Sequence, residues 1–211
     1  MSRLYQYGLA PLLTPEEREL VSGRVPHHLC DYAAGHGYLS LLQWSDRKEW
    51  SETTCDEAAY GGRLEILKWL HAQGCPWDEE TCEAAVYGGH LAVLQWLHAQ
   101  GCPWDERTCE AATQDGHLTL LKWLHAQGCP WNEWTCASAA GGGHLEVLQW
   151  LRAQGCPWSK YSCKAAADGG HLAVLQWLRA QGCPWNKAGC INVARYRPAV
   201  FAWLLSGDCP D

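Results

Sequence analysis

Most of this chain consists of a short segment that recurs, and the pattern of apolar and polar residues within each copy predicts two short helices. Residues 78–104, DEETCEAAVYGGHLAVLQWLHAQGCPW, show the pattern. Asp78 is a good N-cap, and we expect the helix after it to end near Tyr87. Beyond two glycines, a second helical segment has an apolar face at Leu91, Val93, Leu94, Trp96 and Leu97. Gly101 and Pro103 end it, so the unit predicts helix, turn, helix, loop.

The same unit repeats with a fixed step of 27 residues. One cysteine ladder stands in the first helix, at Cys55, Cys82, Cys109, Cys136, Cys163 and Cys190. Another follows the second helix, at Cys75, Cys102, Cys129, Cys156 and Cys183. Tryptophans keep the same step at Trp69, Trp96, Trp123, Trp150 and Trp177, and after Cys-Pro at Trp77, Trp104, Trp131, Trp158 and Trp185. So many positions in register indicate one solenoid rather than independent domains.

Comparison between the copies separates packed positions from outward ones. Two adjacent positions stay small, as close stacking of helices requires, and hold Ala84, Ala111, Ser138 and Ala165, then Ala85, Ala112, Ala139 and Ala166. Two other positions change character from copy to copy, and hold Glu80, Arg107, Trp134 and Tyr161, then Glu83, Glu110, Ala137 and Lys164. Packing between repeats cannot require one residue type at these variable positions. We therefore expect them to face outwards.

The unit resembles the ankyrin repeat, because T-C-x-A-A-x-x-G-G-H-L-x-V-L-x-W-L-x-x-x-G-C follows the ankyrin helix pair. The ankyrin threonine matches Thr54, Thr81, Thr108 and Thr135. The Gly-His turn matches Gly89-His90, Gly116-His117, Gly143-His144 and Gly170-His171. The resemblance implies an all-α, ankyrin-type helix-turn-helix solenoid in which these histidines tie the inter-helix turns together. The short Gly-Cys-Pro-Trp form is similar to repeats of giant-virus and protist proteins.

The unit departs from the ankyrin pattern in two ways. Cysteine replaces the usual proline after threonine, and the unit is about six residues shorter than the common repeat. The loss falls mainly in the loop after the second helix, so we expect shortened or absent β-hairpin fingers. The predicted organisation is an N-terminal helical cap at 1–29, six repeats at 30–189 with the first shortened, and a degenerate capping repeat at 190–211.

Charge and hydropathy narrow the choice of partners. The net charge of −7 over 211 residues opposes binding to nucleic acid, which requires basic surfaces. No run of about 18 apolar residues occurs, and the N-terminus lacks the apolar core of a signal peptide. We therefore expect no membrane partner, an intracellular and most simply cytoplasmic protein, and a monomer.

The cysteines and histidines do not predict catalysis or metal binding. Thirteen cysteines, an odd number without a secretion signal, indicate buried apolar residues in a reducing compartment rather than disulfides. Six residues separate Cys75 from Cys82, against about two to four in zinc knuckles, so we expect no metal. Four equivalent turn histidines favour a structural role over a general base. We expect no catalytic residue and no cofactor.

The two tryptophan ladders are expected to provide the main packing energy of the array, because each buried indole removes a large apolar area from water. The tryptophans that follow proline, such as Trp104, should fold back over the seam between repeats. One position of the second helix holds histidine in three repeats and arginine in two. We expect it to be solvated, and it holds His71, His98, His125, Arg152 and Arg179.

The function that fits these features is a non-catalytic protein-protein interaction scaffold or adaptor. Its partner should lie on a concave face lined by the first helices. The predicted contact residues are Glu80, Glu83, Tyr87, Arg107, Glu110, Gln114, Trp134, Ala137, Tyr161, Lys164 and Asp168. Trp134 beside the small Ala137, with Tyr161 one repeat away, has the composition of an interface hot spot. The alternatives are the substrate-recognition module of a ubiquitin ligase, an enzyme and a metal-binding protein.

Overall fold

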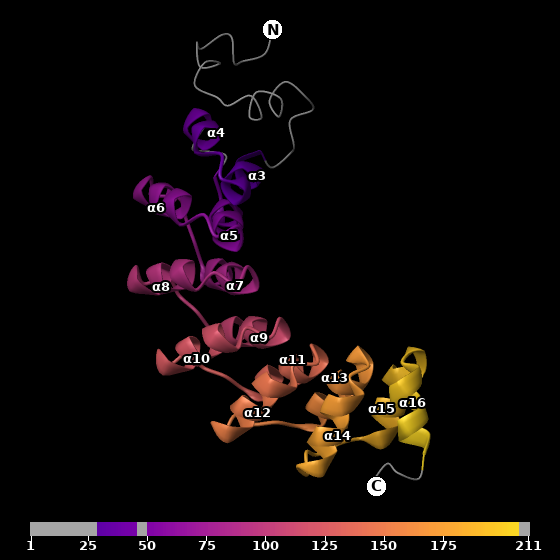
Figure 1. Cartoon of the computed structure of the whole chain (residues 1–211). Helices are drawn as coiled ribbons and strands as arrows, with labels where there is room; N and C mark the ends of the chain where they lie inside the picture. The colour runs from indigo at the N-terminus through magenta and orange to yellow at the C-terminus, as the bar shows by residue number, and fades with distance from the viewer. Residues whose placement is uncertain (1–28, 46–49, 207–211) are drawn as a thin grey trace. The chain divides into compact units, whose positions relative to one another are not determined.

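The chain forms a succession of short helix pairs (Figure 1). The computed structural model describes residues 29–45 and 50–206, and these contain helices and loops but no strand. They fall into two compact units that divide between Pro103 and Trp104. The predicted cap at 1–29 lies outside the described residues except for Leu29, as does Cys209 at the other end. Over the described residues, the predicted absence of β-hairpin fingers is confirmed.

In the first unit the first helix of each pair packs against the first helix of the next pair. These first helices are α3 (Leu29–His36), α5 (Glu52–Tyr60) and α7 (Glu79–Tyr87). Their partners in the pairs are α4 (Leu39–Trp44), α6 (Leu64–Ala72) and α8 (Leu91–Ala99). The α7 helix ends at Tyr87, as the sequence predicts.

The second unit repeats this arrangement. Its first helices are α9 (Glu106–Gln114), α11 (Glu133–Gly141), α13 (Lys160–Gly169) and α15 (Lys187–Val193). The second helices are α10 (Leu118–Ala126), α12 (Leu145–Ala153), α14 (Leu172–Ala180) and α16 (Pro198–Leu205). A short 3-10 helix, η3 (Ala194–Tyr196), lies between α15 and α16. The adjacent first helices α9, α11, α13 and α15 again pack side by side (Figure 1).

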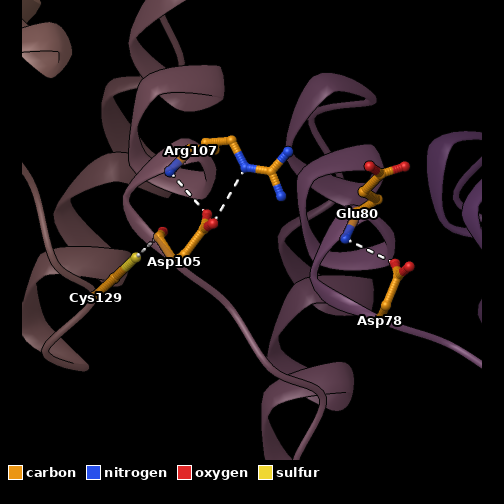
Figure 2. Close-up of polar contacts among 5 residues, drawn as sticks. All are labelled: Asp78, Glu80, Asp105, Arg107 and Cys129. Carbon is orange, nitrogen blue, oxygen red and sulfur yellow. Dashed lines mark hydrogen bonds and ion pairs between the residues drawn. The ribbon is translucent and has the colours of Figure 1, made fainter.

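Each first helix of the regular repeats begins at a capping residue that the sequence identifies. The Asp78 carboxylate accepts the backbone N–H of Glu80 at 2.9 Å, and Asp105 accepts that of Arg107 at 2.9 Å (Figure 2). These bonds satisfy backbone donors that have no partner inside the helix. In α7 the Thr81 hydroxyl completes a capping box by accepting the backbone N–H of Asp78 at 3.4 Å. The expected helix start at Asp78 is confirmed.

The Gly-His turns join neighbouring repeats as well as neighbouring helices. Gly143 adopts a φ of 80°, in the left-handed region that favours glycine. The ring of His144 lies against Gly116 and Gly142, and its Nε2–H donates to the carbonyl oxygen of Gln114 in the preceding repeat at 2.9 Å. A Cβ on Gly142 would collide with that same carbonyl. The tying role implied for the turn histidines is confirmed at His144.

The fully buried core consists of leucines, cysteines and alanines. Each regular second helix buries two leucines completely, at Leu67 and Leu70, Leu94 and Leu97, Leu121 and Leu124, Leu148 and Leu151, and Leu175 and Leu178. The small positions expected to stack between helices are buried at Ala85, Ala112, Ala139 and Ala166. Replacing one such leucine by alanine typically costs about 2–5 kcal/mol, so this double row dominates the packing energy.

The tryptophan ladders are half-buried and lie outside the fully buried core, and their expected contribution as the main packing energy stays a prediction. Their expected place over the seam is confirmed, because Trp77 in the loop meets Trp96 of the next second helix edge to face at 5.7 Å. Trp104 meets Trp123 in the same way at 5.9 Å. Such pairs contribute about 0.5–1.5 kcal/mol beyond burial.

The second-helix position that holds histidine in some repeats and arginine in others was expected to be solvated, but its side chains stack on tryptophans. His71 stacks on Trp77 with ring centroids 3.9 Å apart, and the Arg152 guanidinium lies 3.9 Å from the Trp158 ring centre. The two residue types perform the same task because both a planar imidazole and a planar guanidinium cover an indole face. His125 and Arg179 stack on Trp131 and Trp185 in the same way.

All twelve described cysteines are buried, and none of them forms a disulfide. The Cys102 thiol donates to the carbonyl oxygen of Asp78 at 3.3 Å, and the Cys129 thiol donates to that of Asp105 at 3.4 Å (Figure 2). The second ladder therefore ties the end of each repeat to the start of its first helix. A hydrogen bond with Cys75, followed by burial, raises the pKa of the Cys55 thiol far above its usual range. Such a thiol stays protonated and unreactive.

Candidate interaction surface

The first helices carry two grooves, one in each compact unit. The acidic groove, of about 400 Å³, lies over α5 and α7 and is lined by Asp56, Glu57, Tyr60, Glu80, Glu83, Ala84 and Tyr87. The aromatic groove, of about 680 Å³, lies over α11 and α13 beside the end of α9. It is lined by Gln114, Asp115, Trp134, Ala137, Ser138, Gly141, Gly142, Tyr161, Lys164, Ala165 and Asp168.

One wall of the aromatic groove is a pair of stacked rings from two successive repeats. Trp134 and Tyr161 lie with ring centroids 4.8 Å apart and planes inclined by 25°. The side chains nevertheless remain 47% and 37% exposed. Both residues stand one position into their helix, and the Asn132 cap holds Trp134 by accepting its backbone N–H at 2.7 Å. The wall is therefore rigid and presents aromatic surface to solvent.

The floor of the aromatic groove is made of small residues. Ala137 is only 5% exposed, so the expectation that its position faces outwards was wrong for this repeat. A methyl group is too short to emerge between the closely packed α11 and α13, whereas the longer Lys164 at the equivalent position is exposed. Ser138, Gly141 and Ala165 continue the floor. Bulky aromatic side chains beside a floor of small residues leave room for an incoming side chain.

A hydrogen bond that joins repeats elsewhere is missing at this floor. The Thr54 hydroxyl donates to the Asp31 carboxylate at 2.6 Å, and the Thr81 hydroxyl donates to the Asp56 carboxylate at 2.6 Å. In the aromatic groove the corresponding pair is Ala137 and Ser162, and the methyl side chain of alanine cannot accept a hydrogen bond.

The Ser162 hydroxyl is buried and has no hydrogen-bond partner among the residues that the structure describes, and the same holds for the Thr108 hydroxyl, whose corresponding residue is Glu83. A buried hydroxyl in this state costs about 1–3 kcal/mol. The aromatic groove therefore lacks the bond that Thr54 and Thr81 form in the first unit.

The acidic groove keeps that bond and has a charged floor. Desolvation, opposed by the Thr81 hydrogen bond and reinforced by the charges of Asp78 and Glu80, raises the pKa of Asp56 to about 6. Tyr60 and Tyr87 stand on its rim with 56% and 39% of their surface exposed. This groove combines phenol rings with carboxylates, whereas the aromatic groove combines stacked rings with small side chains.

The structure brings most of the predicted contact residues into one or the other groove. Glu80, Glu83 and Tyr87 line the acidic groove, and Gln114, Trp134, Ala137, Tyr161, Lys164 and Asp168 line the aromatic groove.

Two predicted contact residues, Arg107 and Glu110, line neither groove. The Arg107 Nε donates to the carboxylate of its own cap, Asp105, at 3.1 Å (Figure 2). Burial, opposed by a hydrogen bond to Asn132, raises the pKa of the Glu110 carboxyl above its usual value.

Sequence reasoning missed several lining residues. Tyr60 is the equivalent of Tyr87 one repeat earlier, so the repeat register could have identified it. Asp115 follows Gln114 directly, at the end of α9. Ser138 and Ala165 were expected only as packing residues, and they line the groove because the larger side chains beside them leave part of each accessible.

Other kinds of site were also sought in the described part of the chain. Residues 29–45 and 50–206 contain no group of three or more His, Cys, Asp or Glu side chains placed to hold a metal ion. None of their helices has the length and apolar character needed to cross a membrane.

Comparison with known proteins places the repeats in a family. Residues 109–152 match the family model for ankyrin repeats (many copies). No curated protein matches the chain in sequence. The human ASB11 ankyrin repeat domain is similar in structure, with a TM-score of 0.64 and 19% identity over 89% of this chain and 100% of that one.

The pentatricopeptide repeat protein PPR10, in complex with an 18-nt psaJ RNA element, has a TM-score of 0.42 and 15% identity, covering 98% of this chain and 36% of that one. This likeness is too low to bear on fold or function. The ASB11 likeness extends the ankyrin assignment from the matched segment to most of the array, as a statement about fold. The chain therefore matches the ankyrin repeat family in sequence over residues 109–152, and the fold of the wider array is similar to that of an ankyrin repeat domain.

Proposed function

We propose that this chain is a non-catalytic protein-interaction module that holds its partner on the first-helix surface, chiefly in the aromatic groove. The observation that carries the proposal is the half-exposed Trp134, stacked on Tyr161 over a floor of small side chains. Large rigid aromatic side chains beside a recess dominate the energy of protein interfaces. The ankyrin fold, which presents residues of successive repeats in a row, supports the same function.

The predicted contact residues of both grooves, together with Arg107 and Glu110, belong to this proposal. A role as the substrate-recognition module of a ubiquitin ligase would use the same surface, so the same variants test it. Catalysis is not favoured, because neither groove contains a histidine or cysteine; their polar side chains are carboxylates, three tyrosines, one tryptophan, one lysine, one serine and one glutamine.

The experiment is affinity capture with the full chain as bait, in parallel with Trp134→Ala and Tyr161→Ala. The matched control is Tyr196→Ala, which removes another exposed aromatic side chain, 90% exposed and outside both grooves. We expect quantitative mass spectrometry to find proteins that the parent and the Tyr196 variant retain and that both groove variants lose. Purified partners that bind all four chains equally would refute the aromatic groove as the site.

A further inference from the structure

The position of Ala137 stands apart from its equivalents in the other repeats. In the other regular repeats the equivalent positions hold Asp31, Asp56, Glu83, Glu110 and Lys164, all ionisable, and in the degenerate last repeat the position holds Ile191. Where the structure shows the bonds of the two aspartates, each accepts a hydroxyl of the following repeat. Alanine at 137 removes the charge and the acceptor together, and the Ser162 hydroxyl is left buried without a partner in the described structure.

This substitution changes the chemistry of the groove floor. An ionisable group beneath the Trp134 and Tyr161 rings would have to be desolvated by any apolar side chain that entered, which is costly. Without that group, the recess has an aromatic wall and a floor of Ala137, Gly141 and Ala165. The charged groups that line the groove are Asp115, Lys164 and Asp168, which carry both signs. The polarity of the floor therefore matches an uncharged anchor, with polar groups available for the flanking peptide.

We propose that Ala137 is the specificity-determining position of the array, and that the recess it opens receives an apolar side chain from an extended segment of a protein partner. This inference rests on the proposed function of the aromatic groove and adds the chemical class of what binds there. In the absence of a ligand, we expect an aspartate introduced at position 137 to accept a hydrogen bond from the Ser162 hydroxyl.

The binding test uses a phage-displayed library of random peptides selected on the full chain, followed by titration of synthetic peptides of the selected sequences. We expect the selected peptides to share one large apolar residue. We also expect their affinity to fall about tenfold or more with A137D and with W134A. A137S keeps the floor small and should bind as the parent does, as should the Y196A control.

A second variant guards against a folding defect in A137D. A137K introduces charge through the residue that the next repeat carries at Lys164, and it should also lose binding. The stability test compares the change in melting temperature caused by A137D in the parent and in the S162A background. Recovery of the missing bond predicts a more favourable change when the Ser162 hydroxyl is present.

The outcomes separate this inference from the proposed function. Peptides that lose affinity with W134A but bind A137D and A137K normally would overturn the role of Ala137 and leave the groove as the site. Selected peptides with charged anchors, or no peptide selected, would overturn the apolar anchor. Self-association of the parent that A137D abolishes would assign the recess to a second copy of the chain. Peptides indifferent to W134A would instead refute the proposed function itself.

Discussion

The acidic and aromatic grooves stand on the same face of the same repeat design, yet they differ in what lies beneath them. The acidic groove retains the bond from the Thr81 hydroxyl to Asp56, and its floor carries charge. The aromatic groove lacks the equivalent bond at Ala137 and Ser162, and its floor is uncharged. Repeats with a common core can therefore differ locally, because a change at one variable position alters both the link between repeats and the floor of the groove.

The largest predicted effect concerns the hydrogen bond between the Thr81 hydroxyl and Asp56 in the acidic groove. Thr81→Val keeps the shape of the side chain and removes a donor to a carboxylate, so it should destabilise the chain by about 2 kcal/mol. The capping bond from Asp78 is lost with it. Urea unfolding followed by circular dichroism measures the change. Thr81→Ser retains the hydroxyl and should recover most of the loss; an equal loss in both variants would show that the bond contributes little.

The second prediction concerns binding in the two grooves. For a partner that occupies the aromatic groove, Trp134→Ala and Tyr161→Ala should each weaken binding by more than about 1 kcal/mol, since each removes half of the stacked wall. Tyr87→Ala, on the rim of the acidic groove, should leave binding to that partner unchanged. Isothermal titration measures all three, and unchanged melting temperatures show that the fold is intact. A larger loss with the Tyr87 variant would reverse the assignment of the two grooves.

Local features of this fold could be predicted from the sequence, and contacts between repeats could not. Asp78 and Tyr87 mark the ends of α7 because capping and helix termination depend on adjacent residues. The burial of Ala137 and the isolation of Ser162 depend on how α11 and α13 pack, which adjacent residues do not determine.

A third prediction uses the titration of Asp56. The folded state holds its proton up to a pKa of about 6, whereas the unfolded chain loses it near 3.8. This group therefore stabilises the fold at low pH, and the contribution is lost as the pH rises through about 6. Asp56→Asn does not titrate and still offers Thr81 an acceptor oxygen.

The difference in melting temperature between the Asp56→Asn variant and the parent should therefore grow in favour of the variant from pH 4 to pH 7. The effect is about 1 kcal/mol or less, because Asp56 is only half-buried and solvent screens its neighbours. Scans at several pH values in constant ionic strength measure it. A difference that is constant with pH would show that Asp56 titrates normally. Ala137→Asn, in the aromatic groove, is the control: it introduces an asparagine at the equivalent position without removing a titrating group, so its difference from the parent should not change with pH.

The smallest predicted effect belongs to Ser162. Its hydroxyl is buried without a partner in the described structure, so Ser162→Ala removes an unfavourable group and introduces the better helix former. The cavity left by the lost oxygen offsets most of this gain, and we expect a stability within about 0.5 kcal/mol of the parent, or slightly above it. The matched comparison is Thr81→Ala, where deletion of a bonded hydroxyl should cost several times more. A loss above about 1 kcal/mol in the Ser162 variant would mean that the hydroxyl is bonded after all. The two grooves would then share the same link between repeats, and the uncharged floor at Ala137 would need another explanation.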